Sequence, residues 1–272
     1  MTIKTSGSSL SFSEIEAEFG ANGSRSLGAY RLTQNVGSLS NLPLDSGVPT
    51  SGTIKFSDFY SKQLNVVVDC HSGGEETRII AKNSKWNNNN LTVIGGFRSK
   101  KEGGSKIIIN VNKKICSNKD AADRCALRTG SWDGTATVQI DVGSSGKILG
   151  SGGDGGNGAN GINNSGSPGG SGTSGLGIDT NNVTVNISSG GIIRAGFGGG
   201  GGGGGNNANQ AYGASGGSGA NLGGNAGGGG NSQTGGGAAG GNGAAIRRTS
   251  GFTVNINNSG SITGITTATG VG

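Results

Sequence analysis

Hydrophobic positions lie mostly before Gly150, where they form short runs bounded by polar and glycine-rich stretches. Runs of about four to eight residues that are rich in apolar and β-branched side chains are typical of strands. The predicted strands are residues 64–70, 78–81, 91–94, 106–111 and 136–142. The pattern at 121–127 predicts a short helix, and Trp86 and Trp132 are expected to anchor the core of this middle region.

A phrase of alternating apolar and polar positions occurs three times, beginning at Val138, Val183 and Phe252. Each copy continues through a turn of Gly, Ser or Asn into a second short apolar run. Two such runs joined by a short turn are typical of a β-hairpin, and the recurrence indicates an internal repeat. We therefore predict three hairpins. Long glycine tracts follow directly after the first two.

Residues 1–62 contain a further internal repeat, because residues 10–15 are similar in sequence to residues 54–59. Each copy is predicted to be a short strand that leads into a serine able to cap a helix. Ser13 is followed by Glu16 in the spacing of a capping box, and Gly20 is expected to end the helix. The pattern predicts a small α+β module, and a module of this size buries little apolar surface unless it binds a partner.

The glycine content sets the second half of the chain apart. The sequence has 62 glycines in 272 residues and 13% charged residues, whereas average proteins have about 7% glycine and about 25% charged residues. Both values lie far from those of an ordinary globular enzyme. Collagen is excluded as well, because the chain lacks a strict Gly-X-Y period and contains only three prolines.

The glycine tracts also differ from flexible linkers, which are the usual interpretation of such composition. They lie between apolar repeats and interleave Asn, Ala and Ser with the glycines. Extended helices of about three residues per turn can pack side by side here, because glycine has no Cβ and the backbone groups of neighbouring helices can pair. We therefore predict a mainly β fold with a glycine-rich polyglycine-II helix bundle, whose polar interruptions form loops at its ends.

The charged residues do not point to nucleic acid as a partner. The net charge is +6, but the basic residues gather between positions 82 and 128 and are mixed with acidic ones. This pattern is typical of a solvated basic face. A signal peptide is not expected, because residues 1–12 are polar and lack an apolar stretch. A membrane span is not expected either, because no run of about 18 apolar residues occurs.

Candidate catalytic and metal-binding groups are few. Asp69, Cys70 and His71 are adjacent, but neighbours on a strand point to opposite faces, so they are not expected to form a nucleophile set. His71 is the single histidine, and a GxGxxG match at 153–158 has no helical pattern after it. We therefore expect a non-enzymatic chain without metal or cofactor. Cys116 and Cys125 form either a disulfide or two free thiols.

Two stretches carry resemblances to known families. The phrases LSFSEIEAEFG, SLGAYR and GTIKFSDFYSK, within residues 10–62, resemble a short N-terminal module that recurs in tail and fibre proteins of bacteriophages. The resemblance implies that this module attaches the chain to the rest of the virion. The residues assigned to that contact are Phe12, Ile15, Phe19, Tyr30, Phe56, Phe59 and Tyr60.

The second resemblance lies in the glycine-rich half. The phrase NISSGGII at 186–193, followed by Gly196 and the glycines of 198–205, is similar to the distal adhesins on long tail fibres of T-even-like phages. The resemblance implies a polyglycine-II sandwich whose variable tip loops choose the receptor. The residues assigned to receptor binding are Asn163, Asn164, Pro168, Asn207, Asn209, Gln210, Tyr212 and Gln233. Tyr212 stands out because a tyrosine gives a large contact area for little conformational entropy.

Together these features predict a phage virion protein made in the host cytoplasm. Residues 1–62 would attach to other tail or fibre proteins, residues 63–149 would form a β-rich middle domain, and residues 150–272 would form the glycine-rich bundle with hairpins and tip loops. The expected partner at the tip is a host cell-surface protein or glycan. A homotrimer, which is common among fibres, and a single chain are both compatible with the bundle. The alternatives are a purely structural decoration or connector protein and a glycan depolymerase.

Overall fold

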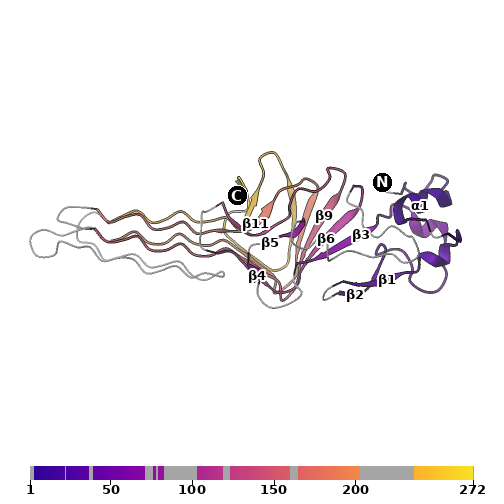
Figure 1. Ribbon diagram of the computed structural model, residues 1–272, viewed down its shortest axis with the longest axis horizontal. Coiled ribbons are helices and arrows are strands. Elements are labelled where there is room, and N and C mark those ends of the chain that lie inside the picture. The colour runs from indigo at the N-terminus through magenta and orange to yellow at the C-terminus, as the bar shows by residue number, and fades with distance from the viewer. Residues whose placement is uncertain are drawn as a thin grey trace, which may run out of the picture.

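The computed structural model describes residues 3–21, 23–36, 39–70, 76–77, 79–82, 103–118, 123–159, 165–202 and 236–271. Over these residues the chain is mainly β, with one α-helix, two 3₁₀-helices and seventeen strands. Figure 1 shows an elongated molecule, with the helical N-terminal part at one end, the strands in the middle and glycine-rich segments extending from the other end.

The middle of the molecule is a parallel β-helix, in which the chain visits three five-stranded sheets in turn. The strands of the first sheet are β3 (Asn65–Asp69), β6 (Lys106–Val111), β9 (Thr137–Val142), β12 (Val183–Ile187) and β15 (Val254–Asn258). Those of the second are β4 (Glu76–Thr77), β7 (Lys114–Cys116), β10 (Lys147–Leu149), β13 (Ile192–Arg194) and β16 (Ser261–Thr263). Those of the third are β5 (Ile79–Ile80), β8 (Cys125–Arg128), β11 (Ser174–Ile178), β14 (Ile246–Arg248) and β17 (Ala268–Thr269). Each turn of the β-helix therefore supplies one strand to each sheet.

The alternation of apolar and polar residues explains why the turns stack. In β12 every second side chain is buried, and Val185 lies in register between Ile140 of β9 and Ile256 of β15. Successive turns thus place similar apolar side chains above one another inside the β-helix. Each fully buried side chain of this size contributes about 1.5–3 kcal/mol, so the repeat builds one continuous core.

The prediction of three hairpins is wrong. β9 and β10 do not pair with each other; β9 pairs in parallel with β6 and β12, and β10 pairs in parallel with β7 and β13. The turn between the two runs moves the chain to the next sheet instead of reversing it. Each sheet also combines strands from 63–149 and 150–272, so the predicted boundary between residues 149 and 150 divides the sheets and separates no domains.

Most of the predicted strands are confirmed. The predictions at 64–70, 106–111 and 136–142 correspond to β3, β6 and β9, and 78–81 contains β5; 91–94 lies outside the described residues. The helix predicted at 121–127 is wrong, because residues 125–128 form β8, which pairs with β5 and β11. Ala126 and Leu127 are both fully buried there, and a short buried run of this kind has no period that distinguishes helix from strand.

The N-terminal module contains α1 (Phe12–Phe19), η1 (Leu27–Tyr30), an antiparallel pair of β1 (Thr33–Val36) and β2 (Leu39–Pro43), and η2 (Phe56–Phe59). The two similar segments, residues 10–15 and 54–59, therefore lead into helices, and the prediction that they are strands is wrong. Ser11, and not Ser13, caps α1. Both serines precede a glutamate by three positions, so the pattern fits either start. The helix ends at Gly20, as predicted, with a φ of 97°.

Glu14 closes the capping box of α1. Its carboxylate accepts a hydrogen bond from the Ser11 N–H at 2.7 Å and lies 2.6 Å from the Lys4 ammonium. The contact with Lys4, followed by the bonds from Ser11, lowers the pKa of Glu14 from 4.5 to about 2. The start of the helix is thus fixed by a carboxylate that stays ionised over almost the whole acidic range.

The module closes the first turn of the β-helix. The apolar core runs without a break from the module into the three sheets. At the junction, the buried Glu18 carboxylate accepts the N–H of Leu64 at 2.8 Å, and the Leu44 carbonyl accepts the N–H of Asn65 at 2.8 Å. Terminal elements that cover the first repeat are a general need of repeat folds, and the module meets that need here.

Candidate functional site

Two turns of the β-helix are interrupted by glycine-rich excursions. In the third turn the chain leaves after β10 through residues 150–158 and returns to β11 through 165–173. In the fourth turn it leaves after β13 through 195–202 and returns to β14 through 236–245. These four segments, called the projection from here on, run away from the sheets side by side (Figure 1).

Backbone hydrogen bonds with a three-residue period hold the projection together. Gly196, Gly199 and Gly202 donate to the carbonyls of Thr173, Gly170 and Ser167 at 2.8, 2.8 and 2.9 Å. The carbonyls of the same three glycines accept from Gly243, Gly240 and Gly237 at 2.9, 2.7 and 2.7 Å. Further bonds of the same period join Gly153 and Gly156 to Phe197 and Gly200, Ser167 and Gly170 to Asn157 and Asp154, and Gly169 and Gly172 to Ala238 and Gly241. The backbone groups of the four segments therefore satisfy one another without a hydrophobic core.

The same period decides where glycine is required. A Cβ on Gly199 would overlap the carbonyl oxygen of Asp154, and one on Gly202 would overlap that of Asn157. Backbone oxygens block a Cβ in the same way at Gly150, Gly153, Gly156, Gly169, Gly172, Gly196, Gly237, Gly240 and Gly243. By contrast, the nearest atom to a Cβ on Gly241 is the Ser171 Oγ, at 3.7 Å. The blocked glycines thus recur with a three-residue period, and in residues 195–202 Gly198 and Gly201 are blocked as well, by the carbonyl oxygens of Gly240 and Gly237. Side chains are confined to the positions that no backbone oxygen blocks.

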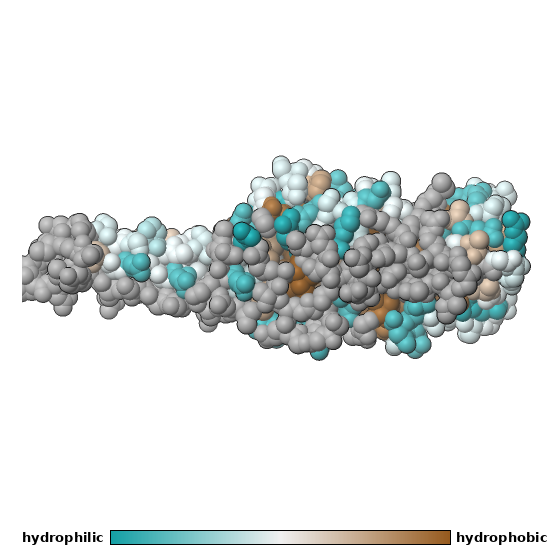
Figure 2. All heavy atoms as spheres, in the orientation of Figure 1, coloured by the Kyte–Doolittle hydropathy of each residue, from teal (hydrophilic) through white to brown (hydrophobic). Residues whose placement is uncertain are grey.

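The side chains on the projection are small and mostly uncharged. Asn157 and Pro168 are exposed, Asp154 is half-buried, and Phe197 is 40% exposed. Pale and teal atoms accordingly cover the visible described part of the projection in Figure 2. Polar groups and an isolated aromatic ring are thus available for contact along its length.

A buried polar cluster fixes the root of the projection. The Ser151 N–H lies 2.9 Å from the Ser117 Oγ and 2.7 Å from the Thr173 Oγ1, and the two hydroxyl groups are hydrogen-bonded to each other. All three residues are fully buried. Since Ser117 follows β7 and the other two open and close the first excursion, the cluster sets the direction in which the projection leaves the β-helix.

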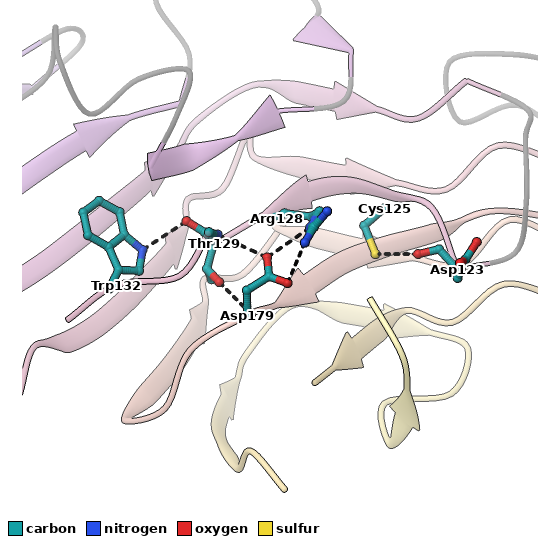
Figure 3. Close-up of polar contacts among 7 residues, drawn as sticks. Asp123, Cys125, Arg128, Thr129, Trp132 and Asp179 are labelled. Atoms are coloured by element: carbon teal, nitrogen blue, oxygen red, sulfur yellow. Dashed lines mark hydrogen bonds and ion pairs between the residues drawn. The ribbon is translucent and has the colours of Figure 1, made fainter. Parts of the chain in front are cut away.

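A second polar cluster locks a corner of the β-helix beside β8 and β11 (Figure 3). The Asp179 carboxylate accepts from the Arg128 Nε at 3.0 Å, from its Nη2 at 2.9 Å, and from the Gly130 N–H at 3.2 Å. The Thr129 Oγ1 accepts a hydrogen bond from the backbone N–H of Asp179 at 2.9 Å. The Thr129 carbonyl accepts one from the indole N–H of Trp132 at 3.0 Å. The hydrogen bond to Asp179 raises the pKa of the Arg128 guanidinium.

The expectation that Trp132 belongs to the core is confirmed, because it is buried. Trp86 lies outside the described residues.

All three cysteines are buried. Cys70, Cys116 and Cys125 form no disulfide, which decides between the two alternatives for Cys116 and Cys125. Burial raises the pKa of Cys125 to about 12, although Arg247 and Arg128 act in the opposite direction. Its Sγ lies 3.4 Å from the Asp123 carbonyl, to which the thiol donates. This thiol is therefore protonated at neutral pH and supplies no thiolate.

In the described part of the chain, no three His, Cys, Asp or Glu residues lie close enough together to hold a metal ion. Over the same residues, no helix has the length and apolar character needed to cross a membrane.

The structure places the predicted receptor-binding residues unevenly. Pro168 is exposed on the projection. The other seven lie outside the described residues: Asn163, Asn164, Asn207, Asn209, Gln210, Tyr212 and Gln233.

Four of the predicted attachment residues are not on the surface. Ile15, Phe19, Tyr30 and Phe59 are fully buried, and the three rings pack with centroids 5.7–6.1 Å apart. Their assignment as contact residues is therefore wrong, because a small module uses its few large apolar side chains for its own core. Phe12 and Tyr60 are half-buried and Phe56 is 41% exposed, so these three remain accessible.

Sequence reasoning missed both polar clusters. Arg128 and Asp179 are separated by 51 positions, and no local motif connects them. The register of the sheets brings them together, because Arg128 of β8 pairs with Gly177 of β11 one turn later. Aligning the internal repeats turn by turn in the sequence could have shown that Arg128 and Asp179 lie in neighbouring turns of the β-helix.

No protein-family model matches the chain, and no curated protein matches it. A solved structure to which it is similar is the crystal structure of the gp37-gp38 adhesin tip complex of the bacteriophage S16 long tail fibre. The similarity covers 95% of this chain and 98% of that chain, at 19% sequence identity and a TM-score of 0.38.

Proposed function

We propose that this chain is a non-enzymatic adhesin of a bacteriophage tail fibre or tail tip. Its glycine-rich projection would present receptor-binding loops to the host cell surface, and its N-terminal module would bind another virion protein. The observation that carries the proposal is the projection itself, which is held by backbone bonds and leaves its side chains free for contact. A fold of this kind can vary its exposed residues without disturbing a core.

We further propose that the four segments of the projection are polyglycine-II helices. The three-residue period of the hydrogen bonds and of the blocked glycines supports this, because such helices have about three residues per turn. The receptor contact would then lie at the far end. The stretches of chain that carry Asn163, Asn164, Tyr212 and Gln233 connect outgoing segments to returning ones.

The attachment surface is proposed to be the exposed side of the aromatic group in the N-terminal module. The rings of Phe12 and Phe56 lie edge to face at 6.2 Å between centroids, and the Tyr60 hydroxyl donates to the Ser8 carbonyl at 2.5 Å. Aromatic side chains that remain accessible are usual anchors in protein interfaces. Several copies on one virion would add weak receptor contacts through avidity.

The test measures binding of the fluorescently labelled full chain to intact cells and envelope fractions from a panel of bacterial strains. Saturable binding to at least one strain is expected. Tyr212→Ala should weaken it by roughly tenfold or more, which is typical of a central aromatic contact. Ser189→Ala, an exposed position on the β-helix away from the projection, is the matched control and should bind like the unmodified chain.

Two results would count against the proposal. Binding to no strain by a chain that is folded by circular dichroism would favour the structural decoration or connector protein. Release of reducing sugar from the envelope fractions would favour the depolymerase.

A further inference from the structure

We infer that the last turn of the β-helix, formed by β15, β16 and β17, is an interface through which two copies of this chain associate end to end. Each of these strands is the outermost of its sheet and pairs on one side only, with β12, β13 and β14 respectively. Within the described residues, no strand pairs with their other side. The inference does not depend on what the projection binds.

The interior of the β-helix is open at this turn. Val254, Ile256 and Ile262 are partly exposed, whereas their register partners one turn earlier, Val183, Val185 and Ile193, are at most 1% exposed. Ile265, which follows β16, is 59% exposed. The first turn is different, because the N-terminal module covers it. Apolar side chains therefore meet solvent at one end of the β-helix.

The last turn has no charged residue of its own, but one cation reaches it from the turn below: the Arg247 guanidinium donates to the carbonyls of Thr269 and Gly270 at 2.8 and 3.3 Å. Residues 249–271 contain no Asp, Glu, Lys, Arg or His. Natural proteins usually protect exposed sheet edges with charged side chains, proline or bulges, and this turn has neither charge nor proline. The surface at the top of the central part in Figure 2, where Figure 1 places the last turn, is largely white. A twofold contact that sets β17 beside β16 of the second copy would not bring the two Arg247 side chains opposite each other, and the rest of the edge is uncharged.

A ladder of side-chain amides and carboxylates also ends at this edge. Asp69, Asn110, Asp141, Asn186 and Asn257 occupy the same register position in successive turns. The Asn186 Nδ2 donates to the Asp141 Oδ1 at 2.8 Å, and the Asn257 Nδ2 donates to the Asn186 Oδ1 at 2.8 Å. Among the described residues no group donates to the Asn257 Oδ1. Asparagine both donates and accepts, so the end of the ladder is complementary to itself.

The occupant that fits this edge is a second copy in a closed dimer. Head-to-tail stacking would need a free first turn, which the module covers, so the last turn can meet only another last turn. A twofold axis is the usual symmetry of such a contact. It would run the strands antiparallel, with β15 beside β15 of the second copy and β16 beside its β17.

The test is the mass of the full chain by analytical ultracentrifugation over a range of concentrations. The unmodified chain should be a dimer. Asn255 and Asn257 are the exposed, outward positions of β15, and they would face each other across the axis. The double variant Asn255→Lys with Asn257→Lys should raise the dissociation constant about tenfold or more, because like charges would lie opposite one another.

A charge swap separates loss of the interface from loss of the fold. The double variant Asn255→Asp with Asn257→Asp should also be monomeric, and an equimolar mixture of the lysine and aspartate variants should recover dimers. Ser51→Lys with Thr53→Lys adds the same charge at exposed positions of the N-terminal module, which covers the other end of the β-helix, and should leave the dimer unchanged.

The inference is overturned if the unmodified chain stays monomeric, if the lysine pair leaves the dimer intact, or if the mixture does not recover it. Hydrogen exchange of β15 adds a further check. Protection that is the same in dilute and concentrated samples would mean that another part of the same chain covers the edge.

Discussion

At the scale of single residues, Asp179 holds the corner between two turns of the β-helix. Its carboxylate accepts from three N–H groups, two of them on the Arg128 guanidinium. The Asp179 side chain is only 10% exposed and that of Arg128 is 29% exposed. A planar, two-point contact of this kind fixes both distance and orientation, so Asp179 positions residues 128–132 as well as pairing a charge.

Replacing this carboxylate tests that role. Asp179→Ala leaves a partly buried guanidinium and the Gly130 N–H without their acceptor, and we expect a loss of about 2 kcal/mol in the free energy of unfolding. Asp123→Ala removes the same charge from an exposed position nearby and should change stability by less than about 0.5 kcal/mol. Urea unfolding measures both. In the double variant with Arg128→Ala, the losses should not add, because the two residues form one unit; full additivity would contradict the assignment.

At the scale of elements, the spacing of glycines in the projection matters more than their number. Some glycines of the projection have a neighbouring carbonyl oxygen where a Cβ would lie, so a side chain is blocked there, and others do not. Gly199 faces the Asp154 carbonyl, whereas Gly241 faces open space up to the Ser171 hydroxyl. Both belong to the same projection, so they form a matched pair.

Gly199→Ala should loosen the projection, and Gly241→Ala should not. The added methyl group at residue 199 forces two segments apart, and overpacking of this kind destabilises by about 1–3 kcal/mol. At residue 241 the same change should be neutral, or should stabilise by up to about 1 kcal/mol because it restricts the unfolded chain. Limited proteolysis of the projection and urea unfolding provide the readouts. Equal sensitivity of the two variants would show that the packing does not follow this register.

Local patterns predicted the strands but not their partners. The alternation in 136–142 depends only on which face of one strand is buried, so it was visible in the sequence. Whether the next strand returns beside it or moves to another sheet depends on contacts with residues about 45 positions away, such as Ile140 with Val185. A hairpin and one turn of a β-helix therefore share the same local phrase. In the same way, Ser11 and Ser13 offer two equivalent starts for α1.

The candidate site shows the same limit. Composition indicated that the glycine tracts pack together, but it could not separate the blocked Gly199 from the open Gly241, because that difference arises from a carbonyl 45 residues away. Pro168, which was assigned to receptor binding, is exposed, whereas Phe19 and Phe59, which were assigned to virion attachment, form the core of the module. Aromatic residues in a small module serve both purposes, and only burial distinguishes them.

At the scale of the whole molecule, the N-terminal module and the β-helix share one core. The apolar cluster contains Phe19 and Phe59 of the module together with Ile109, Ile140 and Ile193 of the sheets. Hydrogen bonds from Leu64 and Asn65 to the module continue the backbone pairing across the junction. The module is therefore expected to unfold with the first turns of the β-helix and not as an independent unit.

Phe59→Ala tests this coupling. Removing a fully buried phenylalanine should destabilise by about 3–5 kcal/mol, and the loss should appear in hydrogen exchange of β3 and β6 as well as in α1, since one cooperative unit opens together. Phe197→Ala makes the same chemical change at a side chain that is 40% exposed on the projection, and it should leave exchange in β3 and β6 unchanged. If Phe59→Ala accelerates exchange in α1 alone, the module folds separately and the shared core does not couple it to the β-helix. If both respond, the module that is proposed to bind the virion also determines the stability of the platform from which the projection extends.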